Sequence, residues 1–466
     1  MEFTEKKILF PFSRIHNPIL VEAHVENGQI KDAFLVDTLY RGFEEILIGR
    51  PALDMPYYTE RICGICSSAH ALTAALAVEQ ALGMSVPHNG ILLRNLILAG
   101  DFLQNHLRHL YLLALPDYFK GPDVAPFIPH LEGDLRFSPT EDAQFTEHYF
   151  KAFEVARQAH AAFGVFGGKA PHGHGIVAGG VTSEVDADKI SRYRGYLMEV
   201  VHFLDDMVIP DINLVAERYP EYVDLGQGNG NYFSVGGFTG IDGENLFPEG
   251  LVIQGSKGHF DEKQVTEDVT TAWYKQTDPL YPGKGQTIPD RGQPKGYTWV
   301  KAPRYQGLPM EVGPLARAVV SRDKIIGHGA IGRLWARTME AKKIALAASA
   351  WLQRLIPGER TLETKVEQDS GIGVGLHEAM RGVLGHWIAV ENGRVKHYQI
   401  VTPSAWNFSS RDKAGTRSVA ENSLLDLKVS KDMTEAGRVI RSYDPCFSCT
   451  VHLLEAENQR TLELWV

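Results

Sequence analysis

Four cysteines are the residues whose type and spacing most clearly indicate chemistry. They form two Cys-x-x-Cys pairs, Cys63 with Cys66 near one end of the 466-residue chain and Cys446 with Cys449 near the other. Thiolates at positions i and i+3 can bind one metal ion, because a turn brings both sulfurs to the same side. Four thiolates suit soft or borderline metals, namely zinc, iron–sulfur clusters, nickel or copper. The two pairs therefore predict one metal site to which both ends of the chain contribute.

The spacing alone leaves several kinds of site open. A structural zinc site is disfavoured, because zinc pairs are usually close in sequence and staple a small module. A thioredoxin-like redox site is disfavoured too, because neither pair lies in a βαβ pattern. An iron–sulfur cluster remains compatible with the spacing. If Cys66 begins a helix, the helix dipole favours its thiolate form.

The residues around the cysteines narrow the choice. Residues 61–70 read Arg-Ile-Cys-Gly-Ile-Cys-Ser-Ser-Ala-His, and residues 444–452 read Asp-Pro-Cys-Phe-Ser-Cys-Thr-Val-His. Both segments resemble the signature motifs of the NiFe-hydrogenase large subunit. Further blocks resemble the same family in the same order, at residues 40–44, 301–317, 378–387 and 401–407. The resemblance extends from about residue 13 to residue 452.

The resemblance implies a role for each matching position. All four cysteines would hold nickel, with Cys63 and Cys446 as terminal ligands and Cys66 and Cys449 as bridges to an iron that carries CO and cyanide. Side chains that would face this NiFe centre are Arg381, Ser404, Thr402 and His70. Arg381 and Ser404 would hydrogen-bond the cyanides, since a fixed guanidinium fork can orient and neutralise an anionic acceptor. His70 would be a donor beside the bridging thiolates.

The resemblance also implies a second metal ion and a reaction. Glu44, the Ile400 carbonyl and His452 would bind Mg²⁺ (or Fe²⁺) and tie the C-terminal motif to the N-terminal region. The implied reaction is reversible heterolytic cleavage of H₂ into protons and electrons. It needs a Lewis acid and a nearby base, and the base is expected to be the thiolate of Cys446, with Arg381 placed over the open metal position.

Two positions depart from the family pattern. The family commonly has a glutamate, the first proton acceptor after the thiolate, where this chain has His16 in Arg14-Ile15-His16. Imidazole can relay protons with a pKa nearer neutrality, but His16 could also simply pack there. Asn105 stands where many relatives have an aspartate. These departures bear on proton transfer and oxygen response, and leave the metal ligands intact.

Residues 453–466 resemble the C-terminal peptide that a dedicated maturation protease removes in this family. An ordinary C-terminal strand is the alternative, because residues 461–466 alternate in polarity. With all four cysteines assigned, none remains to carry electrons away. The expected partner is therefore an iron–sulfur small subunit, in a heterodimer or a dimer of heterodimers. Pro171-His172-Gly173-His174 is expected to form a loop near that interface.

Composition excludes other classes of protein. Formal net charge is −10, from 47 Lys and Arg against 57 Asp and Glu, which argues against nucleic-acid binding by counterion release. The sequence shows neither a transmembrane span nor an N-terminal signal peptide. Synthesis in the cytoplasm is expected, with export or membrane association through the small subunit left open. A regulatory H₂ sensor, a non-catalytic relative like the quinone-site subunit of complex I, and a zinc scaffold remain alternatives to an enzyme.

The expected fold is α+β and predominantly α-helical, with a long-helix bundle around a buried metal site and small peripheral β-sheets. Helices are predicted at residues 67–82, 89–115, 140–163, 183–217 and 315–356, the last broken near 327–329. Thr140 and Ser183 are the predicted N-caps. Hairpins are predicted around Asn27-Gly28 and Asn392-Gly393, and short strands at 250–254 and 297–300. Glu391 and Glu421 are expected to be solvated.

We expect one compact catalytic subunit with five regions. They are an N-terminal β-hairpin region (1–62), a helical core (63–218), a Gly- and Pro-rich insertion of loops and strands (219–310), a second helical part with the C-terminal metal motif (311–452) and the cleavable extension (453–466).

Overall fold

The chain was analysed as a computed structural model. The structure describes residues 4–124, 127–128, 130, 133–286 and 288–447. Helices account for 42% and strands for 22%, so the fold is mixed α and β with helix dominant. Cys449, His452 and the predicted C-terminal extension 453–466 lie outside the described residues.

Two β-hairpins form where Asn-Gly predicted them. β2 (Ile19–Glu26) and β3 (Gln29–Val36) join at Asn27-Gly28, and β12 (Gly382–Glu391) and β13 (Arg394–Val401) join at Asn392-Gly393. In both turns the Asn and the Gly have positive φ, from 49° to 75°. Two-residue hairpin turns of this kind need positive φ at both positions. A third strand, not predicted, completes each antiparallel sheet: β1 (Thr4–Phe12) and β11 (Gly371–Ala379).

The helix predicted at residues 67–82 is confirmed as α3 (Ser67–Leu82). Cys66 occupies the N-cap position without a side-chain capping bond, and Gly83, with φ of 68°, adopts the left-handed conformation that ends the helix. α4 (His88–Arg108) continues into a π-helical turn at His109–Ala114. The predicted break near residue 327 separates α8 (Pro314–Ser321) from α9 (Ala330–Arg354).

The predicted N-caps of two helices are wrong. α5 (Pro139–Gly167) begins after Ser138, whose hydroxyl accepts from the Glu141 N–H while the Glu141 side chain returns to the Ser138 N–H. This capping box uses a serine two positions before the predicted Thr140. α6 (Ala187–Phe203) is capped by Asp186 instead of Ser183. A π-helical turn at Leu204–Val208 then links α6 to α7 (Ile209–Arg218).

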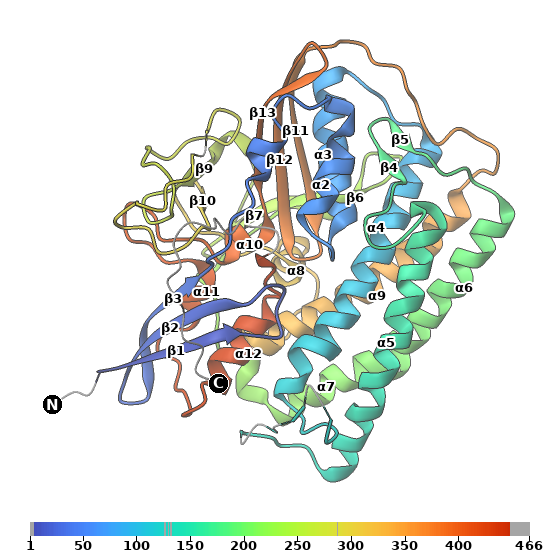
Figure 1. Ribbon diagram of the computed structural model, residues 1–466. Coiled ribbons are helices and arrows are strands. Elements are labelled where there is room, and N and C mark those ends of the chain that lie inside the picture. The colour runs from blue at the N-terminus through green and yellow to red at the C-terminus, as the bar shows by residue number, and fades with distance from the viewer. Residues whose placement is uncertain (1–3, 125–126, 129, 131–132, 287, 448–466) are drawn as a thin grey trace.

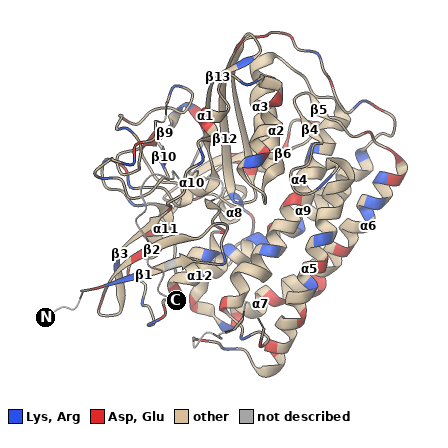
Figure 2. Cartoon of the chain, viewed as in Figure 1, with Lys and Arg blue, Asp and Glu red and all other residues tan. Residues whose placement is uncertain are grey.

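The long helices α4, α5, α6 and α9 lie side by side and form one side of the molecule (Figure 1). Acidic and basic residues are distributed along the outer helices α5 and α6 (Figure 2). α3 differs, because Glu79 is its single charged residue and nearly all of its side chains are buried. α3 therefore lies inside the fold, directly after the first cysteine pair.

α3 packs on β11 without intervening side chains. Gly371, Gly373 and Gly375 alternate along β11 and point at the helix, where an added Cβ would collide with the carbonyl oxygens of Ala81, Ala77 and Thr73. Because β11 pairs with β12 and β12 with β13, this close approach fixes the central sheet against the helix after Cys66. The short helix α2 (Met55–Thr59) also contacts α3.

Residues 219–310 contain loops and strands, of which β6 and β7 are each nine residues long. The strands pair in two antiparallel sheets, one with the order β6-β7-β8 and one with β9 beside β10. Their bounds are β6 (Asn231–Thr239), β7 (Asn245–Ile253), β8 (Ser256–Gly258), β9 (Val265–Asp268) and β10 (Ala302–Tyr305). The strand predicted at 297–300 is wrong, because only an isolated bridge from Thr298 to Ala272 occurs there.

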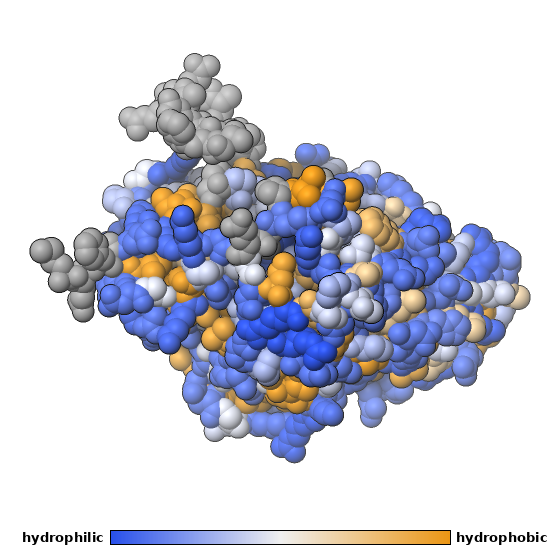
Figure 3. All heavy atoms as spheres, turned by 90° about the horizontal axis from the view of Figure 1, so that it is seen from below, coloured by the Kyte–Doolittle hydropathy of each residue, from blue (hydrophilic) through white to orange (hydrophobic). Residues whose placement is uncertain are grey.

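Short elements complete the fold. They are α1 (Phe43–Ile46), β4 (Ile176–Val177), β5 (Gly180–Val181), α10 (Pro403–Asn407), α11 (Val419–Ser423) and α12 (Thr434–Ser442). Glu421 in α11 is fully buried, which corrects its predicted solvation, whereas Glu391 is exposed as expected. The face in Figure 3 is mostly hydrophilic with separate hydrophobic patches. Among the described residues, no helix combines the length and apolar character that crossing a membrane requires.

Candidate metal centre

Cysteines from both motifs lie buried in the interior, namely Cys63 and Cys66 from the first and Cys446 from the second. The sulfurs of Cys63 and Cys446 lie 3.5 Å apart although 383 residues separate them. This is well beyond the roughly 2.05 Å of a disulfide bond. Cys63, Cys66 and Cys446 are buried, with exposed fractions of 1%, 5% and 0%. The fold thus places thiols from both ends of the chain in one enclosed space.

The C-terminal cysteine is held by the N-terminal segment and by α10. The His16 N–H donates to the Pro445 carbonyl at 3.2 Å, and the Phe447 N–H donates to the His16 carbonyl at 2.8 Å. These bonds form a parallel bridge between His16 and Cys446. The Cys446 N–H donates to Ser404 Oγ at 2.9 Å. Ser404 therefore lies directly beside Cys446.

Local backbone donors favour the thiolate form at the first pair. Cys66 is the N-cap of α3, a helix of 16 residues, so it lies at the positive end of the helix dipole. The Ile65 N–H donates to Cys63 Sγ at 3.4 Å. Both effects stabilise negative charge on sulfur and make these side chains better metal ligands.

The buried guanidinium of Arg381 uses one of its three nitrogens for hydrogen bonds to the described residues. Nη2 donates to Asn105 Oδ1 at 2.7 Å and to Asp444 Oδ1 at 3.0 Å. The buried Nε and Nη1 have no hydrogen-bond partner among the described residues. Burial alone would lower the pKa of Arg381, but the charges of Asp444 and the three cysteines raise it above its ordinary value. A buried, permanently charged edge of this kind fits an anionic acceptor such as a metal-bound cyanide.

Asp444 is the carboxylate that neutralises this region. It accepts from Asn105 Nδ2 at 2.9 Å and lies 3.2 Å from Arg337 Nη1. Burial alone would raise its pKa, but the positive charge of Arg381, with smaller contributions from His109 and Arg337, holds the pKa far below the usual range. Asp444 therefore supplies the negative charge beside Arg381 and Arg337, a role that its place in the motif did not indicate.

A chain of buried charges extends from Asp444 into the helices. Arg337 Nη1 donates to His106 Nδ1 at 2.9 Å, and His106 Nε2 lies 2.8 Å from Glu340 Oε1. Glu340 also accepts two hydrogen bonds from Arg317 at 2.7 Å. No role was predicted for Arg317, Arg337 or Glu340. Only Arg317 gave a signal, because it ends one of the family-like blocks.

The backbone of His16 pairs with that of Cys446, so His16 lies beside the second cysteine motif. Its partly buried imidazole has Nε2 3.9 Å from Asp444 Oδ1. Burial and the charge of Arg381 lower the pKa of His16 to about 4. The imidazole is therefore neutral near pH 7. His70 is buried in α3, and burial lowers its pKa to about 4 although the nearby Cys63 thiolate opposes the shift.

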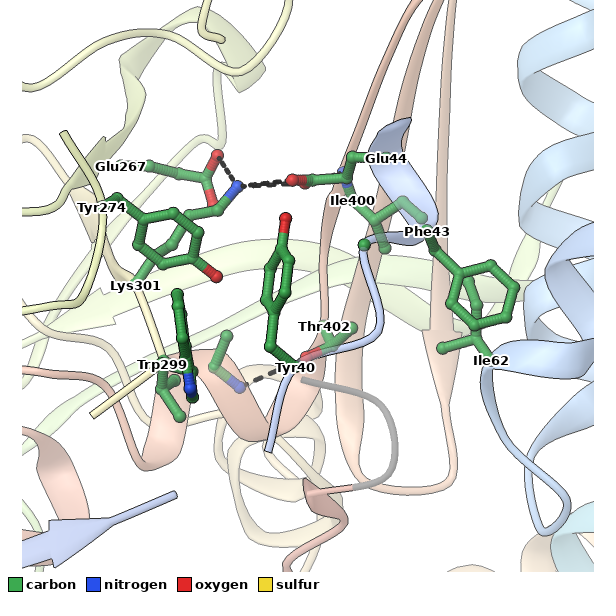
Figure 4. Close-up of a pocket in the computed structure, with 13 residues that line it drawn as sticks. Tyr40, Phe43, Glu44, Ile62, Glu267, Tyr274, Trp299, Lys301, Ile400 and Thr402 are labelled. Carbon is green, nitrogen blue, oxygen red and sulfur yellow. Dashed lines mark hydrogen bonds and ion pairs between the residues drawn. The ribbon is translucent and has the colours of Figure 1, made fainter. Parts of the chain in front are cut away.

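Glu44 lies in a neighbouring pocket with Ile400 and Thr402 (Figure 4). Its carboxylate accepts from the Ile400 N–H at 3.1 Å and from Lys301 Nζ at 3.0 and 3.1 Å. The same ammonium donates to Glu267 Oε2 at 3.2 Å. Burial alone would lower the pKa of Lys301, but Glu267 and Glu44 raise it. Lys301 begins one of the family-like blocks of the sequence, whereas Glu267 lies outside all of them.

The described residues supply part of each predicted ligand set. They bring Cys63 and Cys446 together, and Glu44 beside Ile400. Within residues 4–447 as described, no three His, Cys, Asp or Glu side chains have the spacing to hold a metal ion by themselves. Cys449 and His452 lie outside the description, so both complete ligand sets stay predictions.

Comparison with known proteins identifies the class of protein. A family profile described as "Nickel-dependent hydrogenase" matches residues 41–125 and 119–452. The large subunit of the periplasmic [NiFeSe] hydrogenase of Desulfomicrobium baculatum is 34% identical, over 96% of this chain and 95% of that protein. The large chain of the quinone-reactive Ni/Fe-hydrogenase of Wolinella succinogenes is 32% identical, over 97% of each.

Solved structures agree with this assignment. The Ni-Fe-Se hydrogenase from Desulfovibrio vulgaris Hildenborough in the reduced state matches with a TM-score of 0.94 and 34% identity, over 97% of this chain and 100% of that chain. The H₂-activated [NiFeSe] hydrogenase of Desulfomicrobium baculatum gives the same TM-score with 33% identity. The chain belongs to the nickel-dependent hydrogenase family. It is the catalytic large subunit of a NiFe hydrogenase, an oxidoreductase that acts on H₂.

Proposed function

We propose that Cys63, Cys66, Cys446 and Cys449 together hold nickel, with Cys63 and Cys446 as terminal ligands and Cys66 and Cys449 also bridging to iron. The observation that carries the proposal is the 3.5 Å approach of Cys63 and Cys446 from opposite ends of the chain. Buried thiolates beside helix and backbone donors suit a soft metal centre. A bundle of long helices around this centre, with the regional boundaries predicted above, is part of the same proposal.

The iron would carry CO and two cyanides, held by Arg381, Ser404 and Thr402. Arg381 supports this role through its buried Nε and Nη1, which have no partner among the described residues. Ser404 lies beside Cys446, and Thr402 is the N-cap of α10, where its hydroxyl accepts from the Ala405 N–H. A charged fork and short hydroxyl side chains can orient anionic diatomic ligands in a site that excludes water.

The chemistry that the bound centre supplies is heterolytic cleavage of H₂ and acceptance of electrons. The chain's own part is to handle the proton. Cys446 Sγ is the proposed first base, and Arg381 would supply a fixed positive charge over the open metal position. His16 is the proposed next carrier, because its imidazole is neutral and its backbone pairs with Cys446. A neutral imidazole can take a proton at one nitrogen and release it at the other.

Glu44, the Ile400 carbonyl and His452 would hold Mg²⁺ (or Fe²⁺). Support comes from the Glu44 carboxylate, which already bonds the Ile400 N–H. Lys301 and Glu267 would orient this carboxylate. Oxygen donors in a partly solvated pocket suit a hard cation, which keeps several waters.

The proposed partner is an iron–sulfur small subunit, in a heterodimer or a dimer of heterodimers. All four cysteines are assigned to nickel, so electrons need a carrier from outside this chain. The extension 453–466 would be removed by a maturation protease after nickel insertion. Synthesis in the cytoplasm is proposed, with export or membrane association through the small subunit.

Infrared spectroscopy tests the proposed centre directly. The processed protein with its partner should show bands where metal-bound CO and cyanide absorb, and the bands should shift under H₂. Cys446→Ala should lose nickel and H₂ turnover, while Ser423→Ala, a matched truncation of a buried side chain in α11, should keep both. Absence of bands from the processed complex, or full nickel in Cys446→Ala, would overturn the ligand assignment.

A further inference from the structure

Three buried side chains form a hydrogen-bonded row that ends at His70, four residues after Cys66 in the first turn of α3. His70 Nδ1 lies 3.2 Å from His386 Nε2, and His386 Nδ1 lies 2.7 Å from the Tyr398 hydroxyl. The three exposed fractions are 1%, 0% and 1%. The residues come from α3, β12 and β13, which the close packing of α3 on β11 holds in a fixed relation. The remaining ring nitrogen, His70 Nε2, is buried without a hydrogen-bond partner among the described residues.

The Tyr398 hydroxyl determines which atom donates in each hydrogen bond of the row. Among the described residues its one polar side-chain partner is His386. Burial raises the pKa of Tyr398 far above its ordinary value, so the group remains a phenol with a proton to donate. If this proton goes to His386 Nδ1, then His386 carries its own proton on Nε2 and donates it to His70 Nδ1. His70 must then carry its proton on Nε2.

Donation in the opposite direction, from His70 through His386 to Tyr398, is unfavourable at both Tyr398 and His70. His386 Nδ1–H would donate to the phenol oxygen and leave the phenol proton buried without an acceptor among the described residues, which costs free energy. At the other end, His70 Nε2 would be a buried lone pair without a donor among the described residues. The nearby negative charge of Cys63 acts on His70, and it favours an N–H over a lone pair.

We propose that Tyr398 and His386 are positioning residues that hold His70 as its Nε2–H tautomer and so direct an N–H donor at the cysteine sulfurs. The inference rests on the proposed function, in which these sulfurs bind the metals. A donor on a metal-bound thiolate withdraws electron density from the sulfur, and partners of this kind tune both ligand and metal. Tyr398 would thus act on the centre through two intervening rings.

The tautomer can be measured without the metals. Nitrogen-15 NMR of the full chain labelled at histidine distinguishes Nε2–H from Nδ1–H, and His70→Gln assigns the relevant signals. We expect both His70 and His386 to be Nε2–H. Tyr398→Phe should lower the ratio of Nε2–H to Nδ1–H at His386 by about fivefold, the factor that one ordinary hydrogen bond contributes. Nδ1–H at His70 in the wild type, or an unchanged ratio in Tyr398→Phe, would refute the proposal.

Infrared bands of the loaded complex provide the second measurement. His386→Leu removes the donor to His70 and should move the CO band to lower wavenumber, because a more electron-rich sulfur increases donation from iron into CO. Tyr398→Phe should move it less in the same direction. His386→Gln keeps an N–H for His70 Nδ1 and should leave the band near the wild-type position. Tyr193→Phe, which removes another buried hydroxyl that bonds Leu96 O, is the matched control and should cause no shift.

Equal band positions in His386→Leu and His386→Gln would show that His386 only packs there. Failure of the proposed function is distinguishable, because a wild-type complex without infrared bands would refute the metal centre and leave the tautomer of His70 measurable by NMR.

Discussion

Asp444→Asn should destabilise the protein because it removes the negative charge that two buried arginines share. Asp444 lies 3.0 Å from Arg381, 3.2 Å from Arg337 and 2.9 Å from Asn105, and its exposed fraction is 1%. Asparagine preserves shape and removes the charge. Breaking a buried ion pair by removing one partner costs about 3–5 kcal/mol, since the remaining charges stay buried without compensation.

This free energy corresponds to a measurable change in melting temperature. The unfolding entropy of 466 residues is about 1 kcal/mol per kelvin at 2.1 cal/mol/K per residue. Asp444→Asn should therefore lower Tm by about 3–5 °C in scans of the full complex at one heating rate. Turnover of H₂ should fall by about ten- to a hundredfold, because Arg381 loses its anchor and small displacements of positioned groups are costly.

Asp205→Asn is the matched control for Asp444→Asn. Asp205 pairs with Lys342 at 2.6 Å, but 45% of its side chain is exposed. Exposed ion pairs contribute about 0–1 kcal/mol, so this variant should melt within about 1 °C of wild type. A Tm for Asp444→Asn as close as that would refute the electrostatic role assigned to Asp444, because both variants make the same chemical change.

Three further predictions follow from other contacts. His16→Ala should slow H₂/D⁺ exchange by about tenfold or more while nickel content stays unchanged; an unchanged rate would exclude a relay, and a faster His16→Glu would show that a carboxylate serves there. Arg317 and His106 outweigh burial and lower the pKa of Glu340 from 4.5 to about 2. This lowered pKa means that ionised Glu340 contributes about 3 kcal/mol to the free energy of unfolding. The contribution is present above pH 4.5 and is lost as the pH falls toward 2. The difference in Tm between wild type and Glu340→Gln should accordingly shrink from pH 5.5 to pH 3.5, and a constant difference would contradict this. Lys301→Met leaves Glu44 and Glu267 without their shared ammonium, so it should lower Tm. Millimolar Mg²⁺ should then raise the Tm of this variant more than it raises the Tm of the wild type. An equal effect on both proteins would argue against cation binding at Glu44.

Features with a local cause were predictable from sequence. α3 needs only its Ala- and Leu-rich composition and Gly83, and the two hairpins need only Asn-Gly. β11 was missed because its alternating glycines lack the branched side chains that mark strands, and their reason is the approach of α3. The predicted caps at Thr140 and Ser183 failed because Ser138 and Asp186 offered better-placed acceptors nearby.

Contacts between distant segments could not be predicted from composition and spacing. Glu421 looked like a surface acid, yet it accepts from the Tyr297 hydroxyl and pairs with Arg411 in the interior. The partners of Asp444 lie on α4, α9 and the turn between β11 and β12. The approach of Cys63 and Cys446 could be predicted, because four thiols in two spaced pairs suit one metal site. Arg381 was marked by its motif, whereas nothing in the sequence marked Arg337 as a partner of Asp444.

The bridge between His16 and Cys446 joins segments that are translated at very different times. Cys446 follows Cys63 by 383 positions, which take about 20–80 s to translate at about 5–20 residues per second. During this interval the first cysteine pair and the strand segment around His16 exist without their C-terminal counterpart. Almost the whole chain must be translated before Cys446 can join Cys63. For tens of seconds, therefore, a factor that delivers nickel could reach the first cysteine pair before the second motif covers it.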